Sequence, residues 1–236
     1  ETSGVSKVVG DDSVTAGLLL DPDSVPFPDY RWNQTTYEPI DLSADGLNLQ
    51  TISYIADEVS SAIALGFSFP YYGQEFTEVY VNATGYIQFD DHFIVVDPEE
   101  PVPSDRRLIA VYWEDFDGTS GRVQYSQLTH NGMDAFLISF ADVDSGITGD
   151  QVLPEGGASW QLILHSDGSL DFVLVDVLGD AGTHTIGFFN GTDGHMICRG
   201  SGAECAFSNT QFHVSGPVEH PPPVYATCSD TQNGNY

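Results

Sequence analysis

Apolar and polar residues alternate along residues 65–89, which is the pattern of strands that bury one face. Within residues 76–81 the valines fall on one face, and Glu78 and Tyr80 fall on the other. Turn-forming residues at positions 82–85 favour a hairpin with the apolar run that follows them. This stretch predicts strands over residues 66–69, 76–81 and 86–89.

Short strand patterns recur along the rest of the chain at roughly ten-residue spacing, without a sustained helical period. Residues 107–113 are almost continuously apolar, which indicates a central strand buried on both faces. Asp167 and Gly168 give the strongest hairpin signal in the chain. The fold class predicted is all-β, an antiparallel β-sandwich. Its other predicted strands cover residues 121–128, 135–140, 159–165, 169–177, 183–190 and 211–214.

The pattern divides the chain into an N-terminal arm and linker (1–49), the β-sandwich (50–215) and a proline-rich C-terminal tail (216–236). Three prolines in residues 21–29 predict an extended linker. The arm contains apolar residues that either pack on another subunit, by adding a strand to its sheet, or fold back on their own module. These residues are Val5, Val9, Leu18, Leu19 and Leu20.

The net charge of the chain limits the classes of partner that it can bind. Six Lys and Arg residues stand against 35 Asp and Glu residues, which gives a formal net charge of −29 over 236 residues. Such a chain repels phosphate backbones and anionic lipids, so neither nucleic-acid binding nor direct membrane insertion is expected. No run of about twenty apolar residues is present either. Acidity of this degree favours a secreted protein in a cation-rich medium, although a generally acidic soluble surface explains it equally well.

Three N-x-[ST] sequons, at Asn33, Asn82 and Asn190, predict N-glycosylation. Asn82 and Asn190 fall in predicted turns, which a sandwich leaves exposed. Both the sequons and a polar start at Glu1, typical of a processed N-terminus, agree with an extracellular glycoprotein.

The three cysteines fit the same compartment. Cys198 and Cys205 flank a short glycine-rich loop, which predicts a disulfide between them. Cys228 is left over in the tail and is expected to pair outside the module, within or between chains. A zinc site using His195 is the alternative, but it requires four suitably spaced ligands.

Clustered carboxylates are the main candidates for chemistry. Asp115 with Asp117, and Asp142 with Asp144, offer hard oxygen ligands spaced for Ca²⁺, although such pairs also arise by chance in so acidic a chain. A glycosidase would need an enclosed cleft that raises one carboxyl pKa, and nothing in the sequence indicates one. No nucleophile elbow is present, and the seven histidines are scattered. We therefore expect no enzyme.

Four segments carry a family resemblance: residues 65–89, 108–125, 160–172 and 185–191. In this order they resemble the nidogen-type (NIDO-like) extracellular module of secreted and cell-surface proteins. The resemblance implies a β-sandwich that serves adhesion and matrix assembly and has no shared active site.

Two function classes follow. The first is a secreted or cell-surface structural and adhesive module that assembles with copies of itself, as an oligomer or filament, or joins matrix proteins. The alternative is a Ca²⁺-supported module that binds a glycan or another ligand. An ordered arm on another subunit favours the first, and an open cleft of aromatic and carboxylate side chains favours the second.

Overall fold

The structure is a computed structural model, and it describes residues 29–53, 59–90, 106–114, 121–143, 157–177, 183–191, 193–201, 205 and 207–218. The described residues form strands β1 to β13 and contain no helix. Consequently, none of them supplies a helical membrane span. The strands are β1 (Asp29–Thr35), β2 (Gln50–Ile52), β3 (Ile63–Tyr71), β4 (Gln74–Asn82), β5 (Tyr86–Gln88), β6 (Arg107–Trp113), β7 (Arg122–His130), β8 (Met133–Val143), β9 (Ala158–His165), β10 (Leu170–Asp176), β11 (Thr183–Asn190), β12 (Asp193–Ser201) and β13 (Thr210–Val218).

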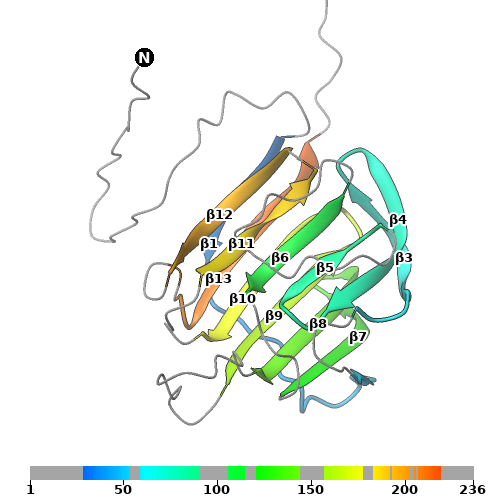
Figure 1. The fold of residues 1–236 in the computed structure, drawn as a ribbon. Helices are drawn as coiled ribbons and strands as arrows, with labels where there is room; N and C mark the ends of the chain where they lie inside the picture. The colour runs from blue at the N-terminus through cyan, green and yellow to red at the C-terminus, as the bar shows by residue number, and fades with distance from the viewer. Residues whose placement is uncertain are drawn as a thin grey trace, which may run out of the picture.

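Two sheets pack face to face (Figure 1). Sheet A has seven strands in the order β1-β13-β10-β9-β8-β7-β2, and sheet B has six in the order β12-β11-β6-β5-β4-β3. Every pairing between these strands is antiparallel. The predicted antiparallel β-sandwich is therefore confirmed.

The main core lies between the sheets. It is built from the residues of each strand that face inward, which alternate along the strand with outward-facing residues. Trp160 of β9 occupies its centre, with the Phe140 ring stacked at 4.7 Å and the Tyr112 ring at 5.5 Å between centroids. Strand β6 also packs a second cluster on its other side, where Trp113 contacts Tyr86 at 5.2 Å. Burial on both faces explains why residues 107–113 are almost continuously apolar.

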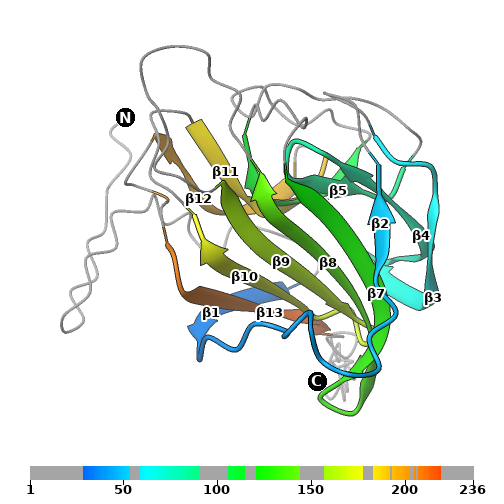
Figure 2. The same ribbon diagram turned by 90° about the horizontal axis from the view of Figure 1, so that it is seen from below.

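A segment that we call the strap, residues 36–49, crosses the outer face of sheet A from β1 at one edge to β2 at the other (Figure 2). Gln161 fixes it in the middle, because its Nε2 donates to the Ile40 carbonyl and its Oε1 accepts from the Ile40 N–H, both at 2.9 Å. Gln211 Oε1 accepts the Glu38 N–H at 2.9 Å. Beneath the strap, apolar residues of the sheet form a third cluster: Ala135, Leu137, Ile163 and Val173.

The sandwich begins earlier in the chain than the sequence predicted. Strand β1 pairs with β13, and the strap lies on sheet A, so residues 29–49 are part of the sandwich rather than an arm and linker. Strand β13 also extends to Val218, into the predicted tail. The arm residues Val5, Val9, Leu18, Leu19 and Leu20, and Cys228 in the tail, lie outside the described residues.

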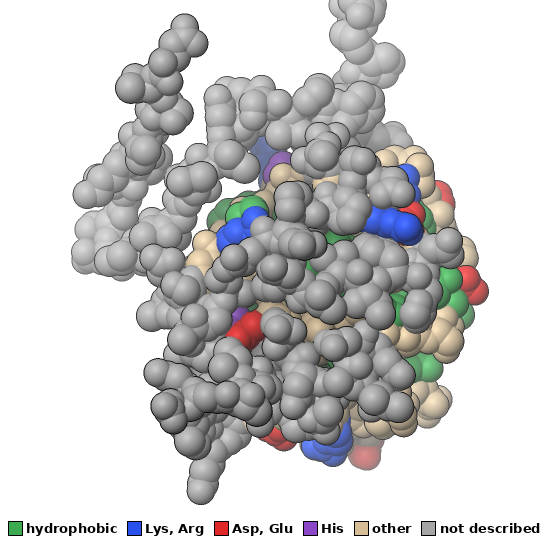
Figure 3. All heavy atoms as spheres, in the orientation of Figure 1, with side chains coloured by type: hydrophobic (Ala, Val, Ile, Leu, Met, Phe, Trp, Pro, Cys, Tyr) green, Lys and Arg blue, Asp and Glu red, His purple; other side chains and the backbone are tan. Residues whose placement is uncertain are grey.

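Figure 3 shows the molecule in the orientation of Figure 1, with described side chains of acidic, basic and hydrophobic type interspersed. No large continuous apolar patch is visible among the described residues of this face.

Candidate functional site

A cluster of three histidines and one aspartate lies on the outer face of sheet A. His130 ends β7, His165 ends β9, Asp171 lies in β10 and His213 lies in β13. Asp171 and His213 are direct cross-strand partners, so their side chains share one face. Their neighbours in the chain, such as Phe172, point into the core, so alternation alone puts the polar residues outside.

Two tight turns bring the histidines to the same end of the sheet. The β7–β8 hairpin turns at Asn131 and Gly132, which have positive φ values of 52° and 80°. In the β9–β10 hairpin, Asp167 Oδ1 accepts the Ser169 N–H at 2.9 Å. Glycine at these turn positions permits the left-handed backbone, so the turn sequences place His130 and His165 side by side. Their rings stack with centroids 5.3 Å apart.

The Asp171 carboxylate joins two of the histidines. His165 Nε2 lies 2.8 Å from Asp171 Oδ2, and His213 Nδ1 lies 2.9 Å from Asp171 Oδ1. Since an ionised carboxylate only accepts, both imidazoles donate. The Asp171 side chain is 5% exposed, whereas that of His213 is 39% exposed, so the cluster runs from the buried sheet to solvent.

Asp171 and His213 each stabilise the charged form of the other. Burial alone would raise the pKa of Asp171, but the hydrogen bonds from His165 and His213 outweigh it and hold that pKa well below its usual range. The hydrogen bond to Asp171 in turn raises the pKa of His213. Burial lowers the pKa of His130, which favours its neutral imidazole. Asp171 is therefore ionised across the ordinary pH range.

His130, His165 and Asp171 could together hold a metal ion. One ligand atom from each residue lies within 4.8 Å of the other two. Two imidazole nitrogens and a carboxylate oxygen form a donor set for a transition metal rather than for Ca²⁺.

A second buried pair has a structural role. Glu114 follows β6 and lies next to the predicted calcium ligands, but its Oε2 is 2.9 Å from His184 Nδ1 in the core. Tyr112 stacks on the same histidine at 4.3 Å. Glu114 is thus oriented toward the sandwich interior, where it balances an imidazole.

The structure describes one of the four predicted calcium ligands. Asp142 is exposed at a register shift of β8, with φ +57° and its N–H donating to Ser159 Oγ at 3.0 Å. Asp115, Asp117 and Asp144 lie outside the described residues. Calcium binding by these loops therefore stays a prediction.

The three sequons differ in their surroundings. Asn33 is exposed on β1, and Asn190 is partly exposed at the end of β11. Asn82 is fully buried: its Nδ2 donates to the Tyr86 hydroxyl at 2.9 Å, and its Oδ1 accepts the Thr84 N–H at 2.8 Å. The prediction that Asn82 is exposed is wrong, because this amide nitrogen is enclosed and already bonded, whereas its glycosylation stays a prediction.

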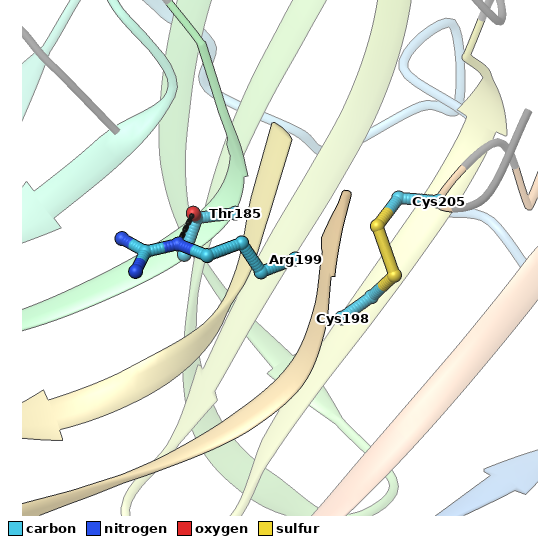
Figure 4. The surroundings of a disulfide bond; sticks show 4 residues. All are labelled: Thr185, Cys198, Arg199 and Cys205. Atoms are coloured by element: carbon cyan, nitrogen blue, oxygen red, sulfur yellow. Dashed lines mark hydrogen bonds between the residues drawn. A yellow bond between two sulfur atoms is a disulfide. The ribbon is translucent and has the colours of Figure 1, made fainter. Parts of the chain in front are cut away.

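The predicted disulfide between Cys198 and Cys205 is present (Figure 4). Cys198 lies in β12 of sheet B, and Cys205 lies on the chain that leads to β13 of sheet A. Next to it, Arg199 Nε donates to Thr185 Oγ at 3.1 Å and holds β12 to β11. The disulfide thus ties edge strand β12 to the connection that leads to β13, and it leaves no thiolate at these positions for the alternative zinc site.

Sequence reasoning missed the histidine–aspartate cluster, because the histidines are far apart along the chain. One signal was present: in a hairpin that turns at Asp167 and Gly168, His165 and Asp171 end on the same face of adjacent strands. Nothing local indicates His213, which reaches Asp171 through the pairing of β10 with β13.

Comparison with protein families gives one match. A family model described as NIDO related covers residues 29–215, starting at the first residue of β1. Searches of curated proteins and of solved structures found no match. The matched range contains both sheets and the strap.

Proposed function

Because the chain belongs to the NIDO-related family, whose modules are in general extracellular and non-enzymatic, we propose that it is a structural and adhesive module that joins copies of itself or other matrix and surface proteins. The disulfide and the net charge of −29 agree with an extracellular medium. The observation that carries the proposal is the edge of sheet A formed by β1.

Strand β1 is an edge strand of sheet A among the described residues. It pairs with β13, and among the described strands none lies beyond it. Tyr30 and Trp32 anchor it, because Tyr30 packs against Phe188 at 5.3 Å and Trp32 packs against Phe212 at 5.8 Å. The outer strand of an open sheet is in general a template for an added strand, and here that strand is anchored.

Two of the other three edges, those formed by β2 and β3, are less suited to this pairing. Strand β2 is three residues long. Strand β3 carries Pro70, a glycine at φ +88° and a register shift in its pairing with β4. Such features blunt an edge against association.

The arm that precedes β1 in sequence has the composition of an inserting strand. Ten extended residues span about 33 Å, which is enough to pass from one domain into the next. Each fully buried leucine stabilises a contact by about 1.5–3 kcal/mol. Repulsion between the acidic chains is screened beyond about 8 Å at physiological ionic strength, whereas apolar burial acts at contact distance. A head-to-tail exchange of arms gives a ring or a filament, depending on whether the rotation closes.

The test replaces the apolar side chains and keeps the arm length and charge. A variant with serine at Val5, Val9, Leu18, Leu19 and Leu20 is compared with wild type by multi-angle light scattering and electron microscopy at physiological salt. We expect wild type to form higher-order particles and the variant to be a monomer. A matched control with alanine at Thr2, Ser3, Ser6, Ser13 and Thr15 should keep the wild-type size. Equal size distributions for all three chains would show that the arm folds back on its own module.

The alternative function, a Ca²⁺-supported glycan-binding module, has less support from the described residues. Trp113 and Trp160 are both fully buried, so neither offers a face on which a sugar could stack.

We also propose that Cys228 locks the contact between subunits covalently. Non-reducing electrophoresis of the particles should then show dimers, and Cys228→Ser should abolish them.

A further inference from the structure

The histidine–aspartate cluster on sheet A has the composition and geometry of an ion-binding site. We propose that His130, His165 and Asp171 bind one divalent transition-metal ion of the Zn²⁺ class. This site uses imidazole nitrogens, so it is chemically distinct from the predicted calcium loops.

The ligand atoms are already close enough for one ion. One atom from each of the three residues lies within 4.8 Å of the others. Ligands of a tetrahedral ion with bonds of about 2.0–2.1 Å lie about 3.3 Å apart. His130 is the partly exposed member of the three, so it is the side chain that we expect to move when an ion binds.

His165 supplies the independent observation. Its side chain is buried and its Nε2 faces Asp171, yet its Nδ1 is buried without a hydrogen-bond partner. Because Nε2 and Asp171 Oδ2 are only 2.8 Å apart, an ion bound by both takes the place of the proton between them. The ring proton then moves to Nδ1, where no hydrogen bond has to be broken.

Neighbouring groups hold the ligands and attract a cation. His213 donates from Nδ1 to Asp171 Oδ1, which orients the carboxylate and leaves its other oxygen toward His165. Glu38 of the strap and Asp167 of the β9–β10 turn act electrostatically on His130 and His213, respectively. These carboxylates and the net charge of the chain raise the local concentration of cations.

The donor set determines which ions compete. Imidazole nitrogens suit Zn²⁺, Co²⁺, Ni²⁺ and Cu²⁺, whereas Ca²⁺ and Mg²⁺ require oxygen ligands. Three protein ligands leave a fourth tetrahedral position for water. We therefore expect Zn²⁺ binding to persist in excess Ca²⁺, which occupies only oxygen sites.

The experiment uses the full chain after chelator treatment. Isothermal titration with ZnCl₂ in excess CaCl₂ should show one saturable site per chain, and Co²⁺ should give the absorbance bands of a tetrahedral site. His130→Gln and His165→Gln should each weaken Zn²⁺ binding at least tenfold. His213→Gln, which removes an orienting hydrogen bond, should weaken it by about 10–100-fold.

His195→Gln is the matched control, because it removes one histidine from β12 of the other sheet and should bind Zn²⁺ as wild type does. Circular dichroism establishes that each variant folds. If His165→Gln does not fold, the partly exposed His130→Gln decides. Two results overturn the proposal: absence of a saturable site in wild type, or equal Zn²⁺ affinity in wild type and His130→Gln.

Discussion

At the residue scale, Asn82 combines the sequence of a glycosylation acceptor with the surroundings of a core residue. The threonine that completes its sequon, Thr84, is also its hydrogen-bond donor in the turn. An Asx turn and a sequon have the same spacing, so sequence alone does not separate them. Burial separates them, because a glycan requires the amide nitrogen that here donates to Tyr86.

We predict that Asn82→Ala lowers the free energy of unfolding by about 1–3 kcal/mol, because the buried Tyr86 hydroxyl and Thr84 N–H lose their partner. Asn33→Ala, at an exposed sequon, should change it by no more than about 0.5 kcal/mol. Urea unfolding measures both. Peptide mass spectrometry of the protein from a glycosylating host should find Asn82 bare, and a glycan on Asn82 would contradict the buried assignment.

A second prediction at this scale concerns pH and Tyr30. Burial raises the pKa of Tyr30 to about 12, although the Tyr72 N–H donates to its hydroxyl oxygen and lowers the value somewhat. The folded pKa thus exceeds the unfolded pKa of 10.0. The contribution of Tyr30 to the free energy of unfolding is fully present below the unfolded pKa. It is lost as the pH rises from the unfolded pKa through the folded pKa. The loss amounts to at most about 3 kcal/mol.

Tyr30→Phe should make the stability profile flatter over this alkaline range. At neutral pH the variant should lose about 1 kcal/mol, because the Tyr72 N–H no longer has its acceptor. Unfolding by urea at a series of pH values measures the slope. A Tyr30→Phe slope as steep as that of wild type would show that Tyr30 does not cause the alkaline loss.

At the element scale, the sequence was most informative where a strand and its neighbour are close in the chain. The predicted hairpin around Asp167 and Gly168 became β9 and β10, and the apolar run at residues 107–113 became β6. Strand β1 was missed, because its pairing partner β13 comes from the far end of the chain. Strand β12 was also missed, since an edge strand with two glycines shows little apolar alternation.

The residues of the candidate site also differ in whether local sequence reasoning could find them. His165 and Asp171 belong to one hairpin and were within reach of local reasoning. His130 joins them through the pairing of β8 with both β7 and β9, and His213 joins them through the pairing of β10 with β13. These placements depend on the order of the strands in the sheet. The calcium ligands were proposed from spacing alone, and spacing in a chain with 35 acidic residues discriminates weakly.

The strap allows a prediction about an element. Gln161→Ala removes both hydrogen bonds to Ile40, so the backbone amide and carbonyl of Ile40 lose their partners. We expect the free energy of unfolding to fall by about 1–3 kcal/mol and amide exchange in residues 36–49 to become faster. Gln124→Ala removes only a weak, exposed contact to Thr51 at 3.4 Å and serves as the control. Unchanged exchange at Ile40 in Gln161→Ala would show that apolar packing alone holds the strap.

At the scale of the whole molecule, charge opposes folding and assembly together. A net charge of −29 makes the compact chain repel itself. Raising ionic strength from 0.01 M to 0.15 M shortens the screening length from about 30 Å to about 8 Å. Screening of charge therefore stabilises the fold in any salt. A specific calcium site would add to the stability by an amount that depends on the identity of the cation and on particular carboxylates.

The last prediction separates these two effects. At matched ionic strength, CaCl₂ should raise the melting temperature more than NaCl or MgCl₂ does, because a site gains stability by mass action. The double variant Asp115→Asn, Asp117→Asn should lose this extra increase. The control Asp45→Asn, Asp134→Asn also removes two negative charges, from exposed positions elsewhere, and should keep it. Calorimetric melting curves in the three salts measure all the differences. If both double variants respond to Ca²⁺ alike, screening accounts for the whole effect and the acidic loops hold no calcium site.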